Sequence, residues 1–187
     1  MPRKKTFQTF REAGKTGAHD ERPMLPDSID IQVYMSRNDH PQPFFLICEK
    51  DTLVCQMSGK GRVEFKDTSV NYHPLVPGDY IYVPAGAPHR LVPDDENVTL
   101  RYKAQDAGLE GIAWYCETCG GELYRDVWDT SAEISHDAYL RVTTEFNEDV
   151  AHRTCDRCGA VHDPVDLSPY RWEEIAEEIR DERARSA

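Results

Sequence analysis

The sequence predicts an all-β fold, either a sandwich or a barrel. Eight short runs of apolar or alternating residues follow one another between residues 29 and 104. Turns rich in Asn, Asp, Gly and Pro separate these runs, and strands at that spacing are typical of sandwiches and barrels. The chain has 187 residues, of which 39% are apolar, and this is enough to bury the core of one domain with an appended unit.

The β region is expected to contain eight strands joined by short turns. In chain order, the expected strands cover residues 29–35, 43–48, 52–57, 61–65, 73–76, 79–84, 89–93 and 97–104. The segments GKG (59–61) and KDTSVN (66–71) have the turn chemistry of hairpins. Cys48 and Cys55 each lie within one of the apolar runs, so we expect both to be small buried hydrophobic residues.

The two ends of the chain differ from this β region. Residues 1–26 are polar and lean basic, and we expect a solvated arm there. The segment 166–187 predicts a helix, because Ser168 can cap it and Pro169 suits the first helical position. One apolar stripe follows from the helical spacing of Trp172, Ile175, Ala176 and Ile179. We expect this stripe to pack on a partner surface, within the subunit or across an oligomer.

Charge and hydropathy exclude two classes of partner. The formal net charge is −12, from 34 acidic and 22 basic residues, whereas a nucleic-acid surface needs a basic patch. The longest apolar run is FFLIC at 44–48, far short of the ~20 residues that span a bilayer. The basic N-terminal stretch lacks the apolar region of a secretory signal, so we expect a cytoplasmic protein that binds neither nucleic acid nor membrane.

Four of the six cysteines form two Cys-x-x-Cys pairs, Cys116 with Cys119 and Cys155 with Cys158. Two such pairs supply four thiolates for a tetrahedral site that suits zinc or a rubredoxin-type iron. A glycine follows each pair directly, so that the chain can turn tightly and its N–H groups can point at the sulfurs. Four thiolates leave no open position, and we therefore expect one Fe or Zn in a closed structural site.

The stretch LVPGDYIYVPAGAPHRLVP at residues 75–93 resembles the second motif of a cupin, a small jelly-roll barrel whose mouth holds a metal. In that motif His89 is the residue that points into the barrel as a ligand. CQMSGKGRVEF at 55–65 resembles the turn that closes the first cupin motif. A cupin joined to two Cys-x-x-Cys pairs resembles the bacterial 3-hydroxyanthranilate 3,4-dioxygenase family, and the likeness runs from about residue 27 to residue 162. It implies catalytic iron(II) in the barrel and a second metal in a rubredoxin-like site.

The residues that the resemblance requires are mostly replaced in this chain. Counting back from Gln56, the family's first histidine ligand falls at Leu46 and its glutamate ligand at Thr52. The two arginines that hold the substrate carboxylate fall near Gln42 and on Pro93. The glutamate that faces the substrate falls on Arg101, which reverses the charge. His89 alone stands where the resemblance predicts a catalytic residue, so standard iron-dependent ring cleavage is doubtful.

Nearby residues are candidates to replace the missing ones. His40, and Glu49 or Asp51, are candidates to complete a barrel metal with His89, and His73 also lies near these strands. The candidate catalytic residues are His89 and Arg101, and the candidates for substrate binding are Arg90, Arg101 and Gln42.

Three functions remain open from the sequence. The first is a diverged 3-hydroxyanthranilate dioxygenase-like cupin that acts on or binds a small aromatic or aminophenol-type acid. The second is an active ring-cleaving dioxygenase with Fe(II) held by the substitute ligands. The third is a non-catalytic, metal-stabilised binding or assembly protein. In each case we expect a homodimer.

The expected organisation has four parts. They are a polar arm (1–26), a cupin barrel (27–113), a rubredoxin-like metal unit (114–163) and a C-terminal helix (164–187).

Overall fold

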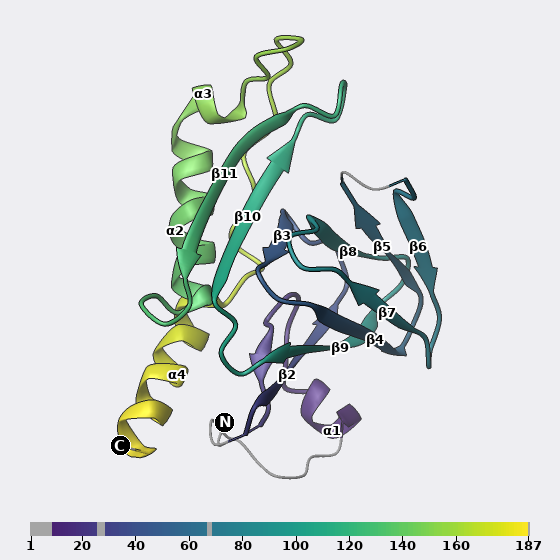
Figure 1. Ribbon diagram of the computed structural model, residues 1–187, viewed down its shortest axis with the longest axis vertical. Helices are drawn as coiled ribbons and strands as arrows, with labels where there is room; N and C mark the ends of the chain where they lie inside the picture. The colour runs from purple at the N-terminus through teal and green to yellow at the C-terminus, as the bar shows by residue number, and fades with distance from the viewer. Residues whose placement is uncertain (1–8, 26–28, 67–68, 187) are drawn as a thin grey trace.

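Two antiparallel sheets face each other in the computed structural model, which describes residues 9–25, 29–66 and 69–186 (Figure 1). The five-stranded sheet has the order β1-β2-β9-β4-β7, and the six-stranded sheet has the order β11-β10-β3-β8-β5-β6. Consecutive strands alternate between the two sheets from β2 to β5 and again from β6 to β10. This alternation is the jelly-roll arrangement of a cupin barrel.

The strands are β1 (Arg22–Pro23), β2 (Ile31–Asn38), β3 (Phe45–Cys48), β4 (Thr52–Ser58), β5 (Gly61–Phe65), β6 (Tyr72–Leu75), β7 (Tyr80–Val83), β8 (His89–Pro93), β9 (Asn97–Ala104), β10 (Leu109–Tyr115) and β11 (Glu122–Asp129). The helices are α1 (Thr9–Ala13), α2 (Ser135–Glu148), α3 (Val150–Arg153) and α4 (Trp172–Ser186). The eight predicted strands correspond to β2 through β9, with ends that differ by up to three residues. Cys48 and Cys55 are buried, as predicted.

The interior of the barrel is apolar at one end and polar at the other. Residues of β4 to β8 form an apolar cluster that includes Val54, Val63 and Leu91. On β9, by contrast, Arg101 and Lys103 share the inward face, because Arg101 contacts the opposite sheet and side chains alternate along a strand. Both side chains are buried. The polar end therefore contains the residues that could form a binding or catalytic site inside the barrel.

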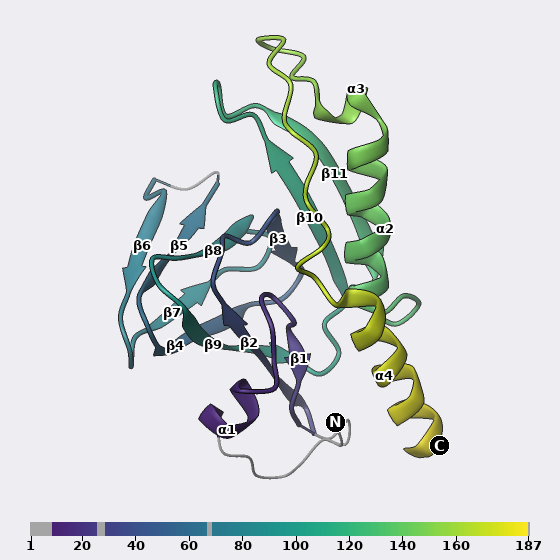
Figure 2. The same cartoon turned by 180° about the vertical axis from the view of Figure 1, so that it is seen from behind.

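Strands β10 and β11 extend the six-stranded sheet beyond the barrel, and α2 covers this extension (Figure 1). Phe44, Trp114, Tyr139 and Phe146 belong to the largest buried cluster, which lies between this sheet and α2. The ring of Trp114 stacks on that of Phe146, with 4.2 Å between ring centroids. The hairpin and α2 had no counterpart among the predicted elements. Figure 2 shows the chain between α3 and α4 running back alongside α2 toward the barrel.

The segment 9–25 packs against the barrel, so the expectation of a solvated arm is wrong for these residues. Ala13 and Met24 pack on the apolar outer face of the five-stranded sheet, against residues of β2, β4 and β9. His19 and Glu21 are 2% and 3% exposed. Polar side chains in this segment find partners inside the molecule, which composition alone does not reveal. Residues 1–8 of the expected arm lie outside the described residues.

Helix α4 begins at Trp172, four residues after the predicted cap at Ser168. The N–H of Ser168 is held by the Asp166 carboxylate, and a turn follows before the helix starts. The predicted apolar stripe is buried, and Trp172 packs within the cluster between α2 and the sheet. The stripe therefore packs within the subunit. In the part of the chain that the structure describes, no helix combines the length and apolar character needed to cross a membrane.

Candidate functional site: a four-cysteine cluster and a charged barrel interior

The four predicted cysteines converge at the far tip of the β10–β11 hairpin. The Sγ atoms of Cys116 and Cys158 are 3.5 Å apart, as are those of Cys119 and Cys155, and all four lie within 4.8 Å of one another. Sulfurs around a tetrahedral zinc with ~2.3 Å bonds would be about 3.8 Å apart. The cluster therefore fits one four-coordinate metal, as the sequence predicted, and it ties the hairpin to the chain after α3.

The two Cys-x-x-Cys turns have the same backbone hydrogen bonds. The N–H of Gly120 donates to the carbonyl of Cys116, and that of Gly159 donates to the carbonyl of Cys155, both at 2.8 Å. Gly120 and Gly159 have φ values of 72° and 74°, in the left-handed region that glycine adopts without strain. The glycines thus close each turn so that both cysteines of a pair face the same point.

The surroundings favour the thiolate form, which a metal requires, at Cys116 and Cys155 but not at Cys158. Backbone N–H groups, chiefly that of Cys119, lower the pKa of Cys116 to about 6. The N–H of Ala160 acts in the same direction on Cys158, but the neighbouring thiols outweigh it and raise the pKa of Cys158 to about 12. Adjacent thiolates repel each other, and a bound cation removes that repulsion.

His89 lies on β8 with its imidazole fully buried inside the barrel. Its Nδ1 lies 2.9 Å from the carbonyl oxygen of Ala87, and its Nε2 lies 2.5 Å from Nη1 of Arg101. A carbonyl only accepts and a guanidinium only donates, so Nδ1 carries the proton and Nε2 offers its lone pair to Arg101. Burial, reinforced by Arg101, holds the pKa of His89 well below its usual range and keeps the ring neutral.

Arg101 reaches across the barrel from β9 and is 1% exposed. Its Nε donates to Oε1 of Glu21 at 3.3 Å, and this carboxylate balances its charge. Although burial acts to raise it, the pKa of Glu21 is lowered because Arg101 and Lys103 favour the carboxylate. The centre of the barrel therefore holds a connected row of side chains, from His89 through Arg101 to Glu21.

A second buried ion pair lies beside the first. Nζ of Lys103 is 2.7 Å from Oε1 of Glu110, and both side chains are at most 4% exposed. The hydroxyl of Ser135, at the start of α2, donates to the other oxygen of Glu110. Sequence reasoning missed Glu21, Lys103 and Glu110. Arg101 and Lys103 lie in the buried run of β9 and could have indicated nearby carboxylates, because buried charges are nearly always paired.

The candidate substitute ligands do not converge on His89. Glu49 is exposed, and its carboxylate accepts from the N–H of Leu109. Asp51 is also exposed and accepts from Tyr82 and from the N–H of Ala85. His40 is half-buried beside Asp39, 2.6 Å from its carboxylate, and its ring contacts those of His19 and Tyr170.

The remaining candidates also lie apart from His89. Arg90 points to the outer side of the six-stranded sheet, where its Nε donates to Glu64. Gln42 is buried, but its side-chain oxygen accepts from the N–H of Leu91 and so holds the backbone of β8. His73 is exposed on β6.

These contacts decide whether the barrel residues fit an iron ion. In the ranges 9–25, 29–66 and 69–186, the four cysteines form the one group of three or more Cys, His, Asp or Glu side chains placed to share a metal. A metal–imidazole bond is about 2.0–2.1 Å long. A metal on Nε2 of His89 would take the place of the Arg101 nitrogen, which lies 2.5 Å away. The residues present therefore do not fit a barrel iron in this arrangement.

Comparison with known proteins finds two curated relatives, both named 3-hydroxyanthranilate 3,4-dioxygenase. The protein from Brucella anthropi is 25% identical over 138 residues, which cover 72% of this chain and 71% of the relative. The protein from Podospora anserina is 27% identical over 96 residues, which cover 45% of each chain, less than half of that relative's length. No family model matches the chain.

Solved structures give a weaker match. Hydroquinone 1,2-dioxygenase PnpCD covers 51% of this chain and 69% of its own, with 19% identity and a TM-score of 0.45. The jelly-roll topology of the two sheets and the similarity to the two curated dioxygenases agree with each other. The chain has a cupin fold, is similar in sequence to two dioxygenases, and carries a four-cysteine cluster that could bind a metal.

Proposed function

We propose that this dioxygenase-like cupin binds a small aromatic acid and does not cleave it through an iron in the barrel. The observation that carries the proposal is the 2.5 Å contact between Nη1 of Arg101 and Nε2 of His89. The two curated relatives are named for a reaction on 3-hydroxyanthranilate, an aromatic acid, and they supply the ligand class. Of the residues that the resemblance requires for iron, this chain keeps His89 alone.

Two physical effects of Arg101 oppose a metal at His89. The guanidinium occupies the lone pair of Nε2, which is the one ligating atom that the neutral imidazole offers in this tautomer. It also places a permanent positive charge beside the site, where the low-dielectric interior strengthens repulsion of a cation. Glu21 balances this charge within the protein.

The four cysteines supply the metal-binding part of the proposal. A metal held by four thiolates has no open position for a substrate, so its role is to hold the hairpin against the chain after α3. Zinc and iron both suit four sulfurs. We propose one such metal per chain, acting as a structural clasp.

Oxygen consumption tests the reaction directly. Purified protein incubated with iron(II), ascorbate and 3-hydroxyanthranilate should take up no more oxygen than the same mixture without protein. The 3-hydroxyanthranilate dioxygenase of Brucella anthropi serves as the positive control in the same buffer. Stoichiometric ring cleavage by this chain would overturn the proposal and would mean that Arg101 moves away from His89 when iron is present.

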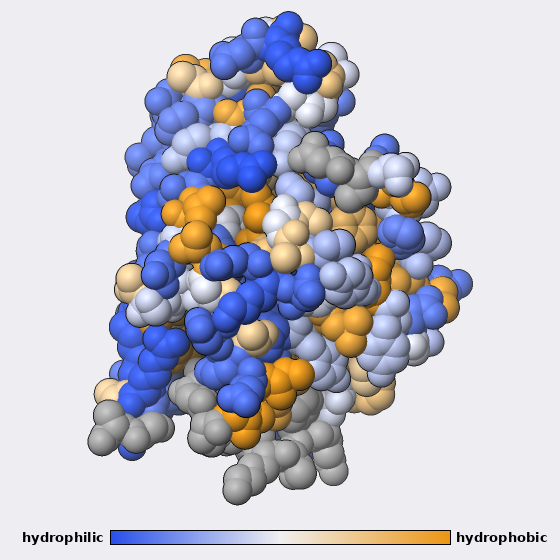
Figure 3. Space-filling view, in the orientation of Figure 1, coloured by the Kyte–Doolittle hydropathy of each residue, from blue (hydrophilic) through white to orange (hydrophobic). Residues whose placement is uncertain are grey.

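We also propose that the protein forms a homodimer through the outer face of the five-stranded sheet. Tyr80 and Tyr82 on β7 are 62% and 58% exposed. They pair in register with Cys55 and Leu53, so all four side chains lie on one face of the sheet. Figure 3 shows orange, apolar patches on the face that it draws, in a colouring that gives tyrosine a pale blue. A second copy of the chain would cover these rings.

A further inference from the structure

A pocket of about 360 Å³ lies outside the barrel, between the six-stranded sheet and the first cysteine turn. Strands β3, β8 and β10 contribute Phe45, Arg90 and Tyr115, and the cysteine turn contributes Cys116, Glu117 and Gly120. Pockets that bind small molecules usually measure about 300–1,000 Å³. The volume therefore suits a single-ring ligand, and the four-cysteine cluster forms part of the wall.

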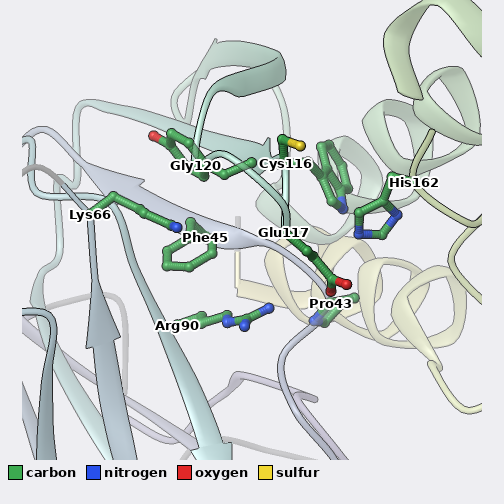
Figure 4. Close-up of a pocket in the computed structure, with 10 residues that line it drawn as sticks. Pro43, Phe45, Lys66, Arg90, Cys116, Glu117, Gly120 and His162 are labelled. Carbon is green, nitrogen blue, oxygen red and sulfur yellow. The ribbon is translucent and has the colours of Figure 1, made fainter. Parts of the chain in front are cut away.

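Two cations and two aromatic rings meet in this pocket. The Lys66 ammonium lies 5.2 Å from the ring centre of Phe45 and 5.1 Å from that of Tyr115. The Arg90 guanidinium lies 4.8 Å from the ring centre of Phe45. Figure 4 shows Lys66 and Arg90 extending toward Phe45 from the same side of the pocket. Such a concentration of positive charge is notable in a chain with a net charge of −12.

Among the residues that the structure describes, neither cation has a carboxylate to itself. Arg90 donates from Nε to Glu64, but Glu64 is shared with Arg62. Although burial acts to raise it, the pKa of Glu64 is held below its usual range by these two arginines. The Lys66 ammonium contacts two aromatic rings. It forms no ion pair with a carboxylate among the residues that the structure describes.

The other side of the pocket offers hydrogen-bonding groups. Trp114 lines the pocket, is 2% exposed, and its buried indole N–H has no hydrogen-bond partner in the described part of the chain. This N–H is shielded from solvent, so it can report on a ligand in the adjoining pocket without binding it directly. Glu117 and His162 also line the pocket, and Figure 4 shows both on the opposite side of Phe45 from Lys66.

We propose that this pocket, and not the barrel interior, is the binding site for a small aromatic carboxylic acid. Lys66 and Arg90 hold the carboxylate, and the rings of Phe45 and Tyr115 contact the ring of the ligand. An amino or hydroxyl substituent on that ring would face Glu117. The inference rests on the proposed function for its ligand class, and it assigns that ligand to a site of its own.

Among the described residues, the cations inside the barrel, unlike those of the outer pocket, are each paired with a carboxylate of their own. Arg101 is paired with Glu21, and Lys103 is paired with Glu110, so these cations already have carboxylates within the protein. An acid entering there would have to displace a buried ion pair, and removing one partner of such a pair is costly. In the outer pocket, a ligand carboxylate adds a partner and breaks none of these pairs.

Isothermal titration calorimetry on the full chain tests the site. The probes are 2-aminobenzoate and benzoate, with cyclohexanecarboxylate and aniline as controls that lack the aromatic ring and the carboxylate. We expect the two aromatic acids to bind and both controls to bind at least tenfold more weakly. The variants Lys66→Met and Arg90→Met should each weaken binding of 2-aminobenzoate about tenfold or more, as expected for loss of a charged hydrogen-bond partner. Lys60→Met removes the same charge at the opposite, exposed end of β5 and should leave the affinity unchanged.

The indole N–H of Trp114 gives a second readout that does not depend on a charge change. The chain has three tryptophans, so a ¹H–¹⁵N spectrum shows three indole signals, and Trp114→Phe identifies the one that belongs to Trp114. Addition of 2-aminobenzoate should shift this signal by more than the other two. No binding of either acid at millimolar concentration, or equal weakening by Lys60→Met, overturns the inference.

The barrel variant Arg101→Met separates the two proposals. If it abolishes binding while Lys66→Met and Arg90→Met do not, the acid binds inside the barrel. The pocket assignment is then wrong, while the proposed function stands as long as no oxygen is consumed. If the pocket variants weaken binding and Arg101→Met leaves the affinity intact, the site is the outer pocket.

Discussion

Arg101 is the residue that most constrains the chemistry of this protein. It lies where the resemblance to the ring-cleaving dioxygenases places a glutamate, so the charge at this position inside the barrel is reversed. The structure gives that cation two partners, His89 and Glu21. Glu21 comes from a distant part of the chain, and its backbone adopts a φ of 43°, which is uncommon outside glycine. In this conformation the Glu21 carboxylate lies 3.3 Å from Nε of Arg101.

Removing the carboxylate should therefore destabilise the protein strongly. Glu21→Gln keeps the shape of the side chain but leaves Arg101 as an uncompensated buried charge. We expect a loss of about 3–5 kcal/mol in the free energy of unfolding, measured by urea denaturation. The matched control is Glu96→Gln, which breaks the exposed pair with Arg37 and should cost less than about 1 kcal/mol. Equal effects of the two substitutions would contradict the assignment of Glu21 as the partner of Arg101.

The buried histidines predict how stability depends on pH. Burial lowers the pKa of His19 to about 4, and it also lowers those of His89 and His136. Between about pH 6.5 and pH 4 the unfolded chain therefore binds protons that the folded chain does not. Stability should fall as the pH drops through this window, by about 3 kcal/mol for His19 alone.

Urea midpoints measured between pH 7 and pH 4.5 check this expectation. His19→Asn should flatten the dependence, because asparagine does not titrate and tolerates the left-handed backbone at this position, where φ is 51°. An identical slope in the variant and in the unmodified protein would show that other groups control acid sensitivity.

Among the elements, the β10–β11 hairpin connects the barrel sheet to the four-cysteine cluster. Its base belongs to the barrel sheet, where β10 pairs with β3, and its tip carries the first cysteine pair. The hairpin and α2 together bury the largest aromatic cluster. The clasp at the tip therefore secures an element on which the main core depends.

Removal of the metal should lower thermal stability. A metal present at a thousandfold above its Kd stabilises the folded state by about 4 kcal/mol, which corresponds to roughly 10 °C in Tm for a chain of this length. Cys116→Ser and Cys155→Ser should each abolish stoichiometric metal binding and lower the Tm, as measured by elemental analysis and calorimetry. The control Cys55→Ala alters a buried cysteine remote from the cluster and should retain the metal. A metal content unchanged by either serine variant would rule out the four-cysteine site.

The elements also show where sequence reasoning succeeds and where it stops. Strands β2 to β9 are short, apolar and bounded by turn residues, so the alternation of their side chains predicts them well. Alternation does not say which face is internal, however. Val33 and Met35 face outward beneath the segment 9–25, whereas Ser36 and Arg101 face the interior. The packing of that segment depends on tertiary contacts that the sequence pattern does not encode, and this is why Glu21 was missed.

At the scale of the whole molecule, the proposed homodimer would use the tyrosines left exposed on β7. Replacing both with arginine (Tyr80→Arg with Tyr82→Arg) places two positive charges on each face and should convert a dimer to a monomer in sedimentation equilibrium. The double variant Val150→Arg with Val161→Arg changes two other exposed apolar residues, near the cysteine cluster, and should remain dimeric. A wild-type chain that sediments as a monomer at micromolar concentration would refute this proposal.

The four cysteines and the fold were accessible from the sequence because each depends on spacing within short segments. The hydrogen bonds and ion pairs inside the barrel could not be predicted from the sequence, because they depend on how β8, β9 and the segment 9–25 pack together. His89 was predicted as a residue of the barrel, but its tautomer and its contact with Arg101 emerge only in three dimensions. The outer pocket likewise combines Lys66, Arg90 and Tyr115, which are far apart in sequence.

We propose that this cupin binds one metal at its cysteines and has an arginine where a barrel iron would bind. Anomalous scattering from crystals of protein loaded with iron(II) and zinc, collected at both absorption edges, distinguishes the two sites. We expect a single peak per chain, among Cys116, Cys119, Cys155 and Cys158, with Arg101 in contact with His89. A second peak within bonding distance of Nε2 of His89 would contradict it.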